Sequence, residues 1–101
     1  MKAEQHHFVV KGASPPTIEV DTKARSVYVR FKRGPVSKTI AQESNEMHVA
    51  VDLDSKGEVV GIEAVGIMDF SIHMLMEKAS VKAPGLDFSR ARYQPIDLAE
   101  A

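Results

Sequence analysis

Acidic residues in the middle of the chain follow the spacing of a calcium-binding loop. Asp52, Asp54 and Glu63 occur in the order Asp-x-Asp-x-Lys-Gly, then five residues, then Glu. A calcium loop of this kind has Asp or Asn where Lys56 stands, because oxygen ligands surround the ion. Lys56 would place a positive charge among those ligands, so the pattern departs from a metal site at its fifth position.

The residues on both sides of this motif indicate strands, whereas a calcium loop is flanked by helices. Apolar and polar residues alternate in residues 47–54 and again in residues 58–65, which is typical of half-buried strands. In such a pair Glu63 points across the sheet and lies too far from Asp54 to close around one ion. We therefore predict a plain β-hairpin without a metal.

The apolar pattern also predicts the register of this hairpin. A two-residue turn at residues 56–57 places Leu53 opposite Val60 and keeps the apolar side chains of both strands on one face. A three-residue loop would set Val49 against Glu63 and mix the two faces. We therefore expect the two-residue turn.

The remaining candidate catalytic residues form no recognisable site. The serines lie in linkers, turns and cap-like positions, and there is no Cys. No pair of histidines has metal-ligand spacing on one helix; they are His6, His7, His48 and His73. We therefore predict no catalytic residue, no metal and no cofactor.

Residues 17–21 and 26–32 alternate in the same way and are joined by a short polar link, so they predict a further hairpin. The polar sides of both hairpins should form one outer face. This face carries a possible interaction patch of Tyr28, Arg30, His48, Asp52 and Glu63. A mixed-charge face is usually the solvated side of an antiparallel sheet.

The pattern changes to helical spacing after Gly66. One face of the expected helix consists of Ile72, Leu75, Met76 and Ala79. We predict an α+β fold, a four-stranded antiparallel sheet of two hairpins with one C-terminal amphipathic helix on one face. Residues 1–16 form an N-terminal arm, residues 17–80 a single domain and residues 81–101 a C-terminal tail.

Composition excludes several classes of function. The chain has 101 residues, of which 44% are hydrophobic and 27% charged, as in an ordinary globular domain. A net charge of −1 argues against a general nucleic-acid binder. The absence of Cys fits a cytoplasmic protein, and no apolar run is long enough to span a membrane.

The tail is apolar at irregular spacing, with Leu86, Phe88 and Tyr93 as its main candidates for contacts. Such a tail gains stability by lying on an apolar surface, either of its own domain or of a second subunit. Because a chain of this length with one helix is short of core, we expect a homodimer.

Residues 17–66 are similar to a known family. The run "IEVDTKARSVYVRF", then "GPVSKTI" and "VAVDLDSKGEVVGIEAVG", resembles the bacterial domain-of-unknown-function family numbered 2283. Val20 stands where the family often has Tyr, and Lys56 where Asp is common. The matching positions are Asp21, Val27, Tyr28, Val29, Asp52, Asp54, Gly57, Val59, Gly61, Ile62 and Glu63.

This resemblance supports the predicted fold and implies no activity, because the family has none established. Some small members look like partners encoded beside a toxin, which implies another small protein as a partner. The preferred hypothesis is a small non-enzymatic protein-interaction module that self-associates. The alternative is a small hydrolase or ligand-binding protein that uses the polar outer face.

Overall fold

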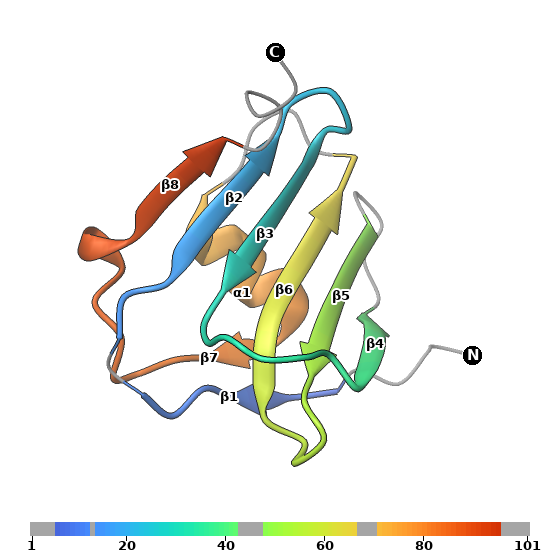
Figure 1. Ribbon diagram of the computed structural model, residues 1–101, viewed down its shortest axis with the longest axis vertical. Coiled ribbons are helices and arrows are strands. Elements are labelled where there is room, and N and C mark those ends of the chain that lie inside the picture. The colour runs from blue at the N-terminus through green and yellow to red at the C-terminus, as the bar shows by residue number, and fades with distance from the viewer. Residues whose placement is uncertain (1–5, 13, 43–47, 67–70, 96–101) are drawn as a thin grey trace.

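The fold is built around one six-stranded sheet. The computed structural model describes residues 6–12, 14–42, 48–66 and 71–95, and the sheet has the strand order β4-β5-β6-β3-β2-β8 (Figure 1). In chain order the strands are β2 (Thr17–Asp21), β3 (Ser26–Arg30), β4 (Lys38–Gln42), β5 (His48–Leu53), β6 (Val59–Val65) and β8 (Arg92–Pro95).

The prediction of a four-stranded antiparallel sheet is wrong. The two predicted hairpins are present, β2 with β3 and β5 with β6, and β3 joins them by pairing with β6. However, β4 and β8 extend the sheet at its two edges, and β8 runs parallel to β2. β4 was not predicted because most of its residues are exposed, so its sequence lacks a clear alternation of apolar and polar residues. β8 was not predicted because it contains Pro95 and pairs with a strand that is far away in the sequence.

The predicted two-residue turn between β5 and β6 is also wrong. Gly57 N donates to Asp54 O at 3.0 Å and Asp54 N donates to Glu58 O at 2.9 Å, which closes a three-residue loop. Gly57 has φ of +81°, as the last position of such a loop requires.

A β-bulge restores the apolar register beyond this loop. Leu53 pairs with Val59, whereas Asp52 pairs with Gly61, so Val60 is the extra residue. The next pair, Val51 with Ile62, again faces the core, as expected from the sequence. The bulge thus allows the longer loop without mixing the two faces.

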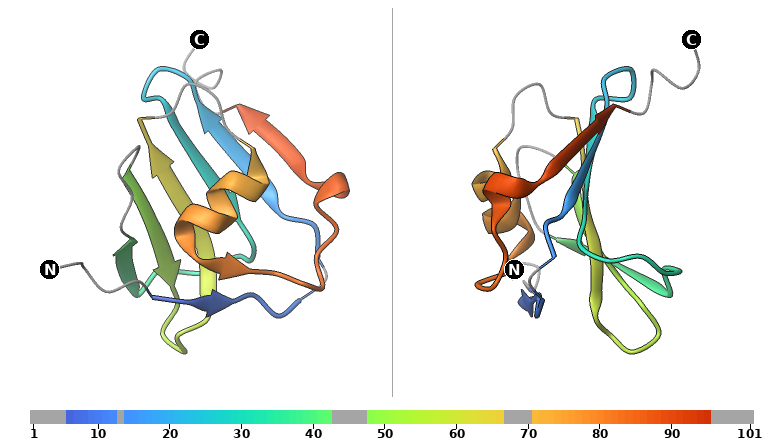
Figure 2. Two further views of the ribbon diagram at one scale, coloured as in Figure 1. Left: turned by 180° about the vertical axis from the view of Figure 1, so that it is seen from behind. Right: turned by 60° about the vertical axis from the view of Figure 1, so that its left-hand side comes forward.

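The helix α1 (Ile72–Ala79) is where the apolar spacing predicts it. Ser71 caps its start, because the Ser71 side chain accepts a hydrogen bond from Met74 N at 3.1 Å. Leu75 and Ala79 are fully buried against the sheet. Figure 2 shows α1 lying across one face of the sheet, which we call the inner face.

The N-terminal arm contributes a small second sheet. β1 (Phe8–Val9) pairs in parallel with β7 (Val81–Lys82), which follows α1 directly. Gln42 at the end of β4 is buried and fastens this region, since its Nε2 donates to His6 O at 2.7 Å and to Ala79 O. Because both amide hydrogens are bonded, this buried side chain is satisfied.

An apolar row crosses the inner face from edge to edge. Its members are cross-strand partners, in the order Ile40, Val51, Ile62, Val29, Ile18 and Tyr93. The four central residues are completely buried. Tyr93 at the β8 edge is 61% exposed and Ile40 at the β4 edge is half-buried, so apolar surface remains at both ends of the row.

The described part of the tail lies on its own chain. Leu86 and Phe88 pack against the core, and a 3-10 turn, η1 (Phe88–Arg90), leads into β8. The homodimer was expected because the tail needed an apolar surface, and the same chain supplies one for these two residues. No helix in the described ranges has the length and apolar character needed to cross a membrane.

Candidate functional site

Tyr28 lies at the centre of the outer face of the sheet, the face opposite α1. Its ring covers Gly61 on the neighbouring strand so closely that a Cβ at Gly61 would lie 2.5 Å from the ring atoms. Only glycine fits beneath the ring, and the ring in turn shields the glycine backbone. Tyr28 can therefore reach across β6 to a residue on β5.

The residue that Tyr28 reaches is Asp52. Tyr28 Oη donates to Asp52 Oδ2 at 2.9 Å, and Thr39 Oγ1 on β4 donates to Asp52 Oδ1 at 2.6 Å. Burial and the hydrogen bond to Asp52 raise the pKa of Tyr28 far above its ordinary value. The phenol therefore stays protonated, and both oxygens of Asp52 are occupied.

Arg30 completes the centre of this face. Its Nε and Nη2 donate to the two oxygens of Glu19 at 2.8 and 3.3 Å, and its guanidinium carbon lies 4.8 Å from the centre of the Tyr28 ring. Hydrogen bonding to Glu19 raises the pKa of Arg30. The contact with the ring is a cation–π interaction, which adds to the ion pair in fixing the side chain.

A separate charged cluster lies at the β5–β6 loop. Lys32 Nζ pairs with Asp54 Oδ2 at 2.6 Å and with Glu58 Oε1 at 2.8 Å. Asp54 Oδ1 also accepts from Lys56 N and Glu58 N, each at 2.9 Å. The bond to Lys32, followed by the backbone bonds, lowers the pKa of Asp54 to about 2.

Two carboxylates of the calcium-like motif, Asp52 and Asp54, have other roles in this structure. Asp52 binds Tyr28 and Thr39, whereas Asp54 organises the turn. Within the described ranges there is no group of three or more His, Asp or Glu residues that could hold a metal ion.

The predicted interaction patch is joined only in part. Tyr28, Arg30 and Asp52 form one connected group. Glu63 is exposed and is the cross-strand partner of Tyr28, and His48 is exposed at the start of β5. Neither forms a hydrogen bond or ion pair with the connected group in the described part of the chain.

Sequence reasoning did not predict the contacts of four residues in these two groups. Thr39 and Gly61 lie on strands whose order was not known, and Lys32 and Glu58 meet only because the loop folds toward β3. A Gly inside an otherwise apolar strand was the available signal, since it marks a close approach of another group.

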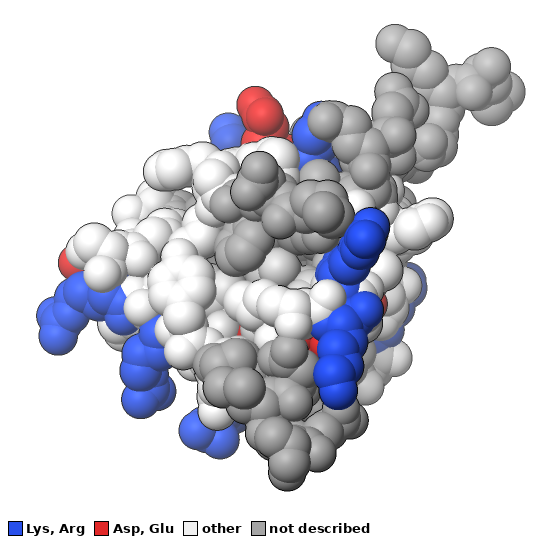
Figure 3. Space-filling model, turned by 90° about the horizontal axis from the view of Figure 1, so that it is seen from above, with Lys and Arg blue, Asp and Glu red and all other residues white. Residues whose placement is uncertain are grey.

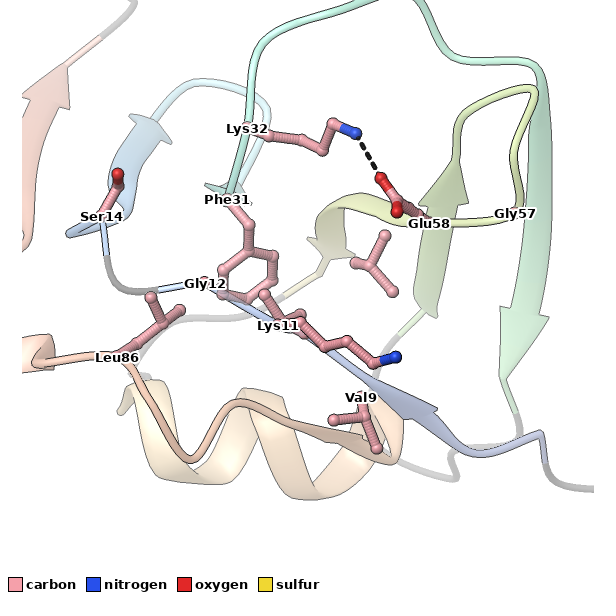
Figure 4. A pocket seen from close by; sticks show the side chains of 11 residues that line it. Val9, Lys11, Gly12, Ser14, Phe31, Lys32, Gly57, Glu58 and Leu86 are labelled. Carbon is pink, nitrogen blue, oxygen red and sulfur yellow. Dashed lines mark hydrogen bonds and ion pairs between the residues drawn. The ribbon is translucent and has the colours of Figure 1, made fainter.

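Two hollows adjoin the end of β3. The first, the arm pocket, has a volume of about 480 Å³ and lies between the N-terminal arm and the β5–β6 loop. Figure 4 shows Phe31 and Leu86 at this pocket, with Lys32 and Glu58 paired beside it. The lining thus combines apolar side chains with the Lys32–Glu58 ion pair and a further cation, Lys11.

The second hollow, which we call the cationic groove, has a volume of about 440 Å³ and opens on the outer face near the β8 edge. It is lined by Thr17, Arg30, Lys32, Arg33 and Arg92, beside Glu19. Four of these side chains are cations and one is a carboxylate. Figure 3 shows one end of the molecule, where some Lys and Arg side chains lie next to one another and others are separated by uncharged side chains.

Comparison with protein-family models, curated proteins and solved structures finds no match to this chain. The resemblance of residues 17–66 to the family numbered 2283 therefore stays a prediction.

Proposed function

We propose that this chain is a small non-catalytic interaction module that associates with a second copy of itself through strand β4. The observation that carries the proposal is the position of β4 at the edge of the sheet that the described residues form, where the apolar row ends at the half-buried Ile40. An edge strand presents unpaired backbone groups, which can pair with another strand.

The two edges of the sheet differ in how well they are protected. β8 contains Pro95, which lacks an N–H and so weakens any further pairing. β4 has five residues without Pro, and Val36, just before it, is 45% exposed. β4 is therefore the better edge for strand addition.

The sequence of β4 suits pairing with an identical strand. In an antiparallel pair centred on Ile40, each Ile40 faces the other, Thr39 faces Ala41, and Lys38 faces Gln42. No like charges stand opposite each other, and the central apolar pair continues the row of the inner face. Such a pair would form one sheet across both subunits.

The way in which the polar groups of the outer face are occupied supports a non-catalytic role. A general base or nucleophile needs an available group with a suitable pKa. Asp52 has both oxygens hydrogen-bonded, and the raised pKa of Tyr28 makes its phenol a poor acid at neutral pH. These groups stabilise the surface, which favours binding over hydrolysis.

Two further expectations belong to this proposal. We place the protein in the cytoplasm, because a chain without Cys fits a reducing compartment. Another small protein could add a strand to the same β4 edge, in which case self-association would compete with that partner.

Sedimentation equilibrium of the full chain from low to high micromolar concentration tests the proposal. We expect a dimer that dissociates on dilution. The Ile40→Lys variant should be monomeric, because two lysines would face each other across the pair. A wild-type protein that stays monomeric throughout this range would contradict the proposal.

Val9→Lys is the matched control, because it adds the same charge at an exposed valine of β1, which belongs to the separate two-stranded sheet. It should dimerise as the wild type does, and circular dichroism should show that both variants are folded. Equal dissociation of the two variants would mean that net charge, and not the β4 edge, controls association.

A further inference from the structure

We propose that the cationic groove binds the phosphate group of a small phosphorylated ligand. The groove lies next to β8, at the opposite edge of the sheet from β4. Its function therefore does not depend on self-association.

The register of three strands builds the floor of the groove. Thr17 on β2 is the cross-strand partner of Arg30 on β3 and of Arg92 on β8. All three side chains point to the outer face, so two arginines flank one hydroxyl group. Neighbouring strands are about 4.8 Å apart, which lets both long side chains converge over Thr17.

The cations of the groove are not equally engaged. Lys32 is paired with Asp54 and Glu58, and Arg30 with Glu19. Arg33 and Arg92 are exposed and have no ion-pair partner within the described ranges. These two arginines supply the uncompensated positive charge of the groove.

Arg30 can still donate hydrogen bonds to a bound anion, although it is paired with Glu19. A guanidinium has five N–H donors, and Arg30 uses its Nε and one Nη2 hydrogen on Glu19. The Glu19 bonds and the Tyr28 ring hold it in place, which reduces the entropy lost when an anion binds.

Donors from three separate segments favour a phosphate. Arg30 and Arg92 approach from either side of Thr17, and Arg33 comes from the loop after β3. A tetrahedral anion can accept bonds from several directions, and arginine suits phosphate particularly well.

The limited number of cations in the groove, and the acidic residues beside them, favour a small ligand over a nucleic acid. Nucleic-acid binding needs an extended basic surface, because affinity rises with the number of phosphates contacted. Here the acidic residues Glu19, Asp54 and Glu58 lie beside the cations, and the whole chain has a net charge of −1. A ligand with one or two phosphate groups therefore fits the groove better than a long nucleic-acid strand.

Nuclear magnetic resonance titration of the full chain with inorganic phosphate, at constant ionic strength, tests this proposal. We expect saturable shifts of the Thr17, Arg33 and Arg92 amides with a Kd of about 1 mM, as a few charge-assisted hydrogen bonds would give. Acetate at the same ionic strength should not saturate these amides. Equal saturation by acetate, or no response to phosphate, would overturn the proposal.

Two pairs of variants distinguish phosphate binding in the groove from a general effect of the net charge of the protein. Arg92→Gln should weaken phosphate binding about tenfold, whereas Lys82→Gln, which removes the same charge on β7, should have little effect. Glu19→Gln should strengthen binding, because it removes a negative charge beside the groove while the amide oxygen of Gln can still accept a hydrogen bond from Arg30. Glu63→Gln is its matched control. If each variant behaves like its control, the groove is not the binding site.

A short single-stranded oligonucleotide provides the last arm of the test. Its affinity should be similar to that of a single phosphomonoester such as adenosine monophosphate. A much tighter complex that weakens steeply with salt would identify a nucleic-acid surface and overturn the small-ligand proposal.

Discussion

The ring of Tyr28 lies directly on Gly61, and a Cβ at Gly61 would come within 2.5 Å of Cε2, Cζ and Oη of that ring. The ring cannot move aside freely, because its hydroxyl is bonded to Asp52. The pair thus links three neighbouring strands, β3, β6 and β5.

The first prediction concerns this pair. Gly61→Ala should lower the free energy of unfolding by about 1–3 kcal/mol, because the added methyl group displaces the Tyr28 ring and its hydrogen bond. Urea unfolding followed by circular dichroism measures the change. In a Tyr28→Ala background the same substitution should be neutral or stabilising by up to about 1 kcal/mol, since Gly weakens a strand interior. An equal loss in both backgrounds would show that the ring is not what excludes the methyl group.

The second prediction follows from the raised pKa of Tyr28. The folded state holds the phenolic proton more tightly than the unfolded state, whose Tyr titrates near 10. The stability that this protonated phenol gives to the folded state is fully present below pH 10, and it is lost as the pH rises toward the pKa that Tyr28 has in the folded state. Unfolding free energies measured between neutral pH and the alkaline range should therefore decline more steeply for wild type than for Tyr28→Phe. Parallel curves would contradict this assignment.

The third prediction concerns acid stability. The pKa of Asp54 in the folded state is lowered to about 2, whereas an Asp in the unfolded chain titrates near 4. The stability that ionised Asp54 gives to the folded state is therefore fully present above pH 4 and is lost as the pH falls through about 2. Thermal unfolding at neutral pH should show Asp54→Asn below wild type and Asp54→Ala lower still. The amide oxygen of Asn can still accept the loop N–H groups but cannot pair with Lys32. The gap between wild type and Asp54→Asn should narrow at the acid end, and a constant gap would argue against an ionised Asp54.

The fourth prediction concerns the loop residue Gly57, which has φ of +81°. Gly57→Val should lower the free energy of unfolding by about 1 kcal/mol or more, because a β-branched residue is strained at positive φ. Gly57→Asn should be milder, since Asn tolerates this region. Open space surrounds the position, so any difference reports backbone strain and not a clash. Identical melting temperatures for the two variants would contradict it.

Local features of the sequence determined the helix and the two hairpins. The alternation in β2, β3, β5 and β6 and the helical spacing of α1 both arise from neighbouring residues, so each element could be predicted from its own segment. The same alternation placed Tyr28, Arg30 and Asp52 on one face, which the structure shows. Periodicity is a local property, and these conclusions needed nothing else.

Tertiary structure alone decided which side chains meet. Strand order makes Gly61 the residue between Tyr28 and Asp52, and it places Thr17 between Arg30 and Arg92. β8 joins the sheet because the chain returns along β2, and no local pattern encodes a pairing between segments so far apart. Cross-strand neighbours are chosen by the burial of the whole inner face, and that choice is made only when every strand is in place.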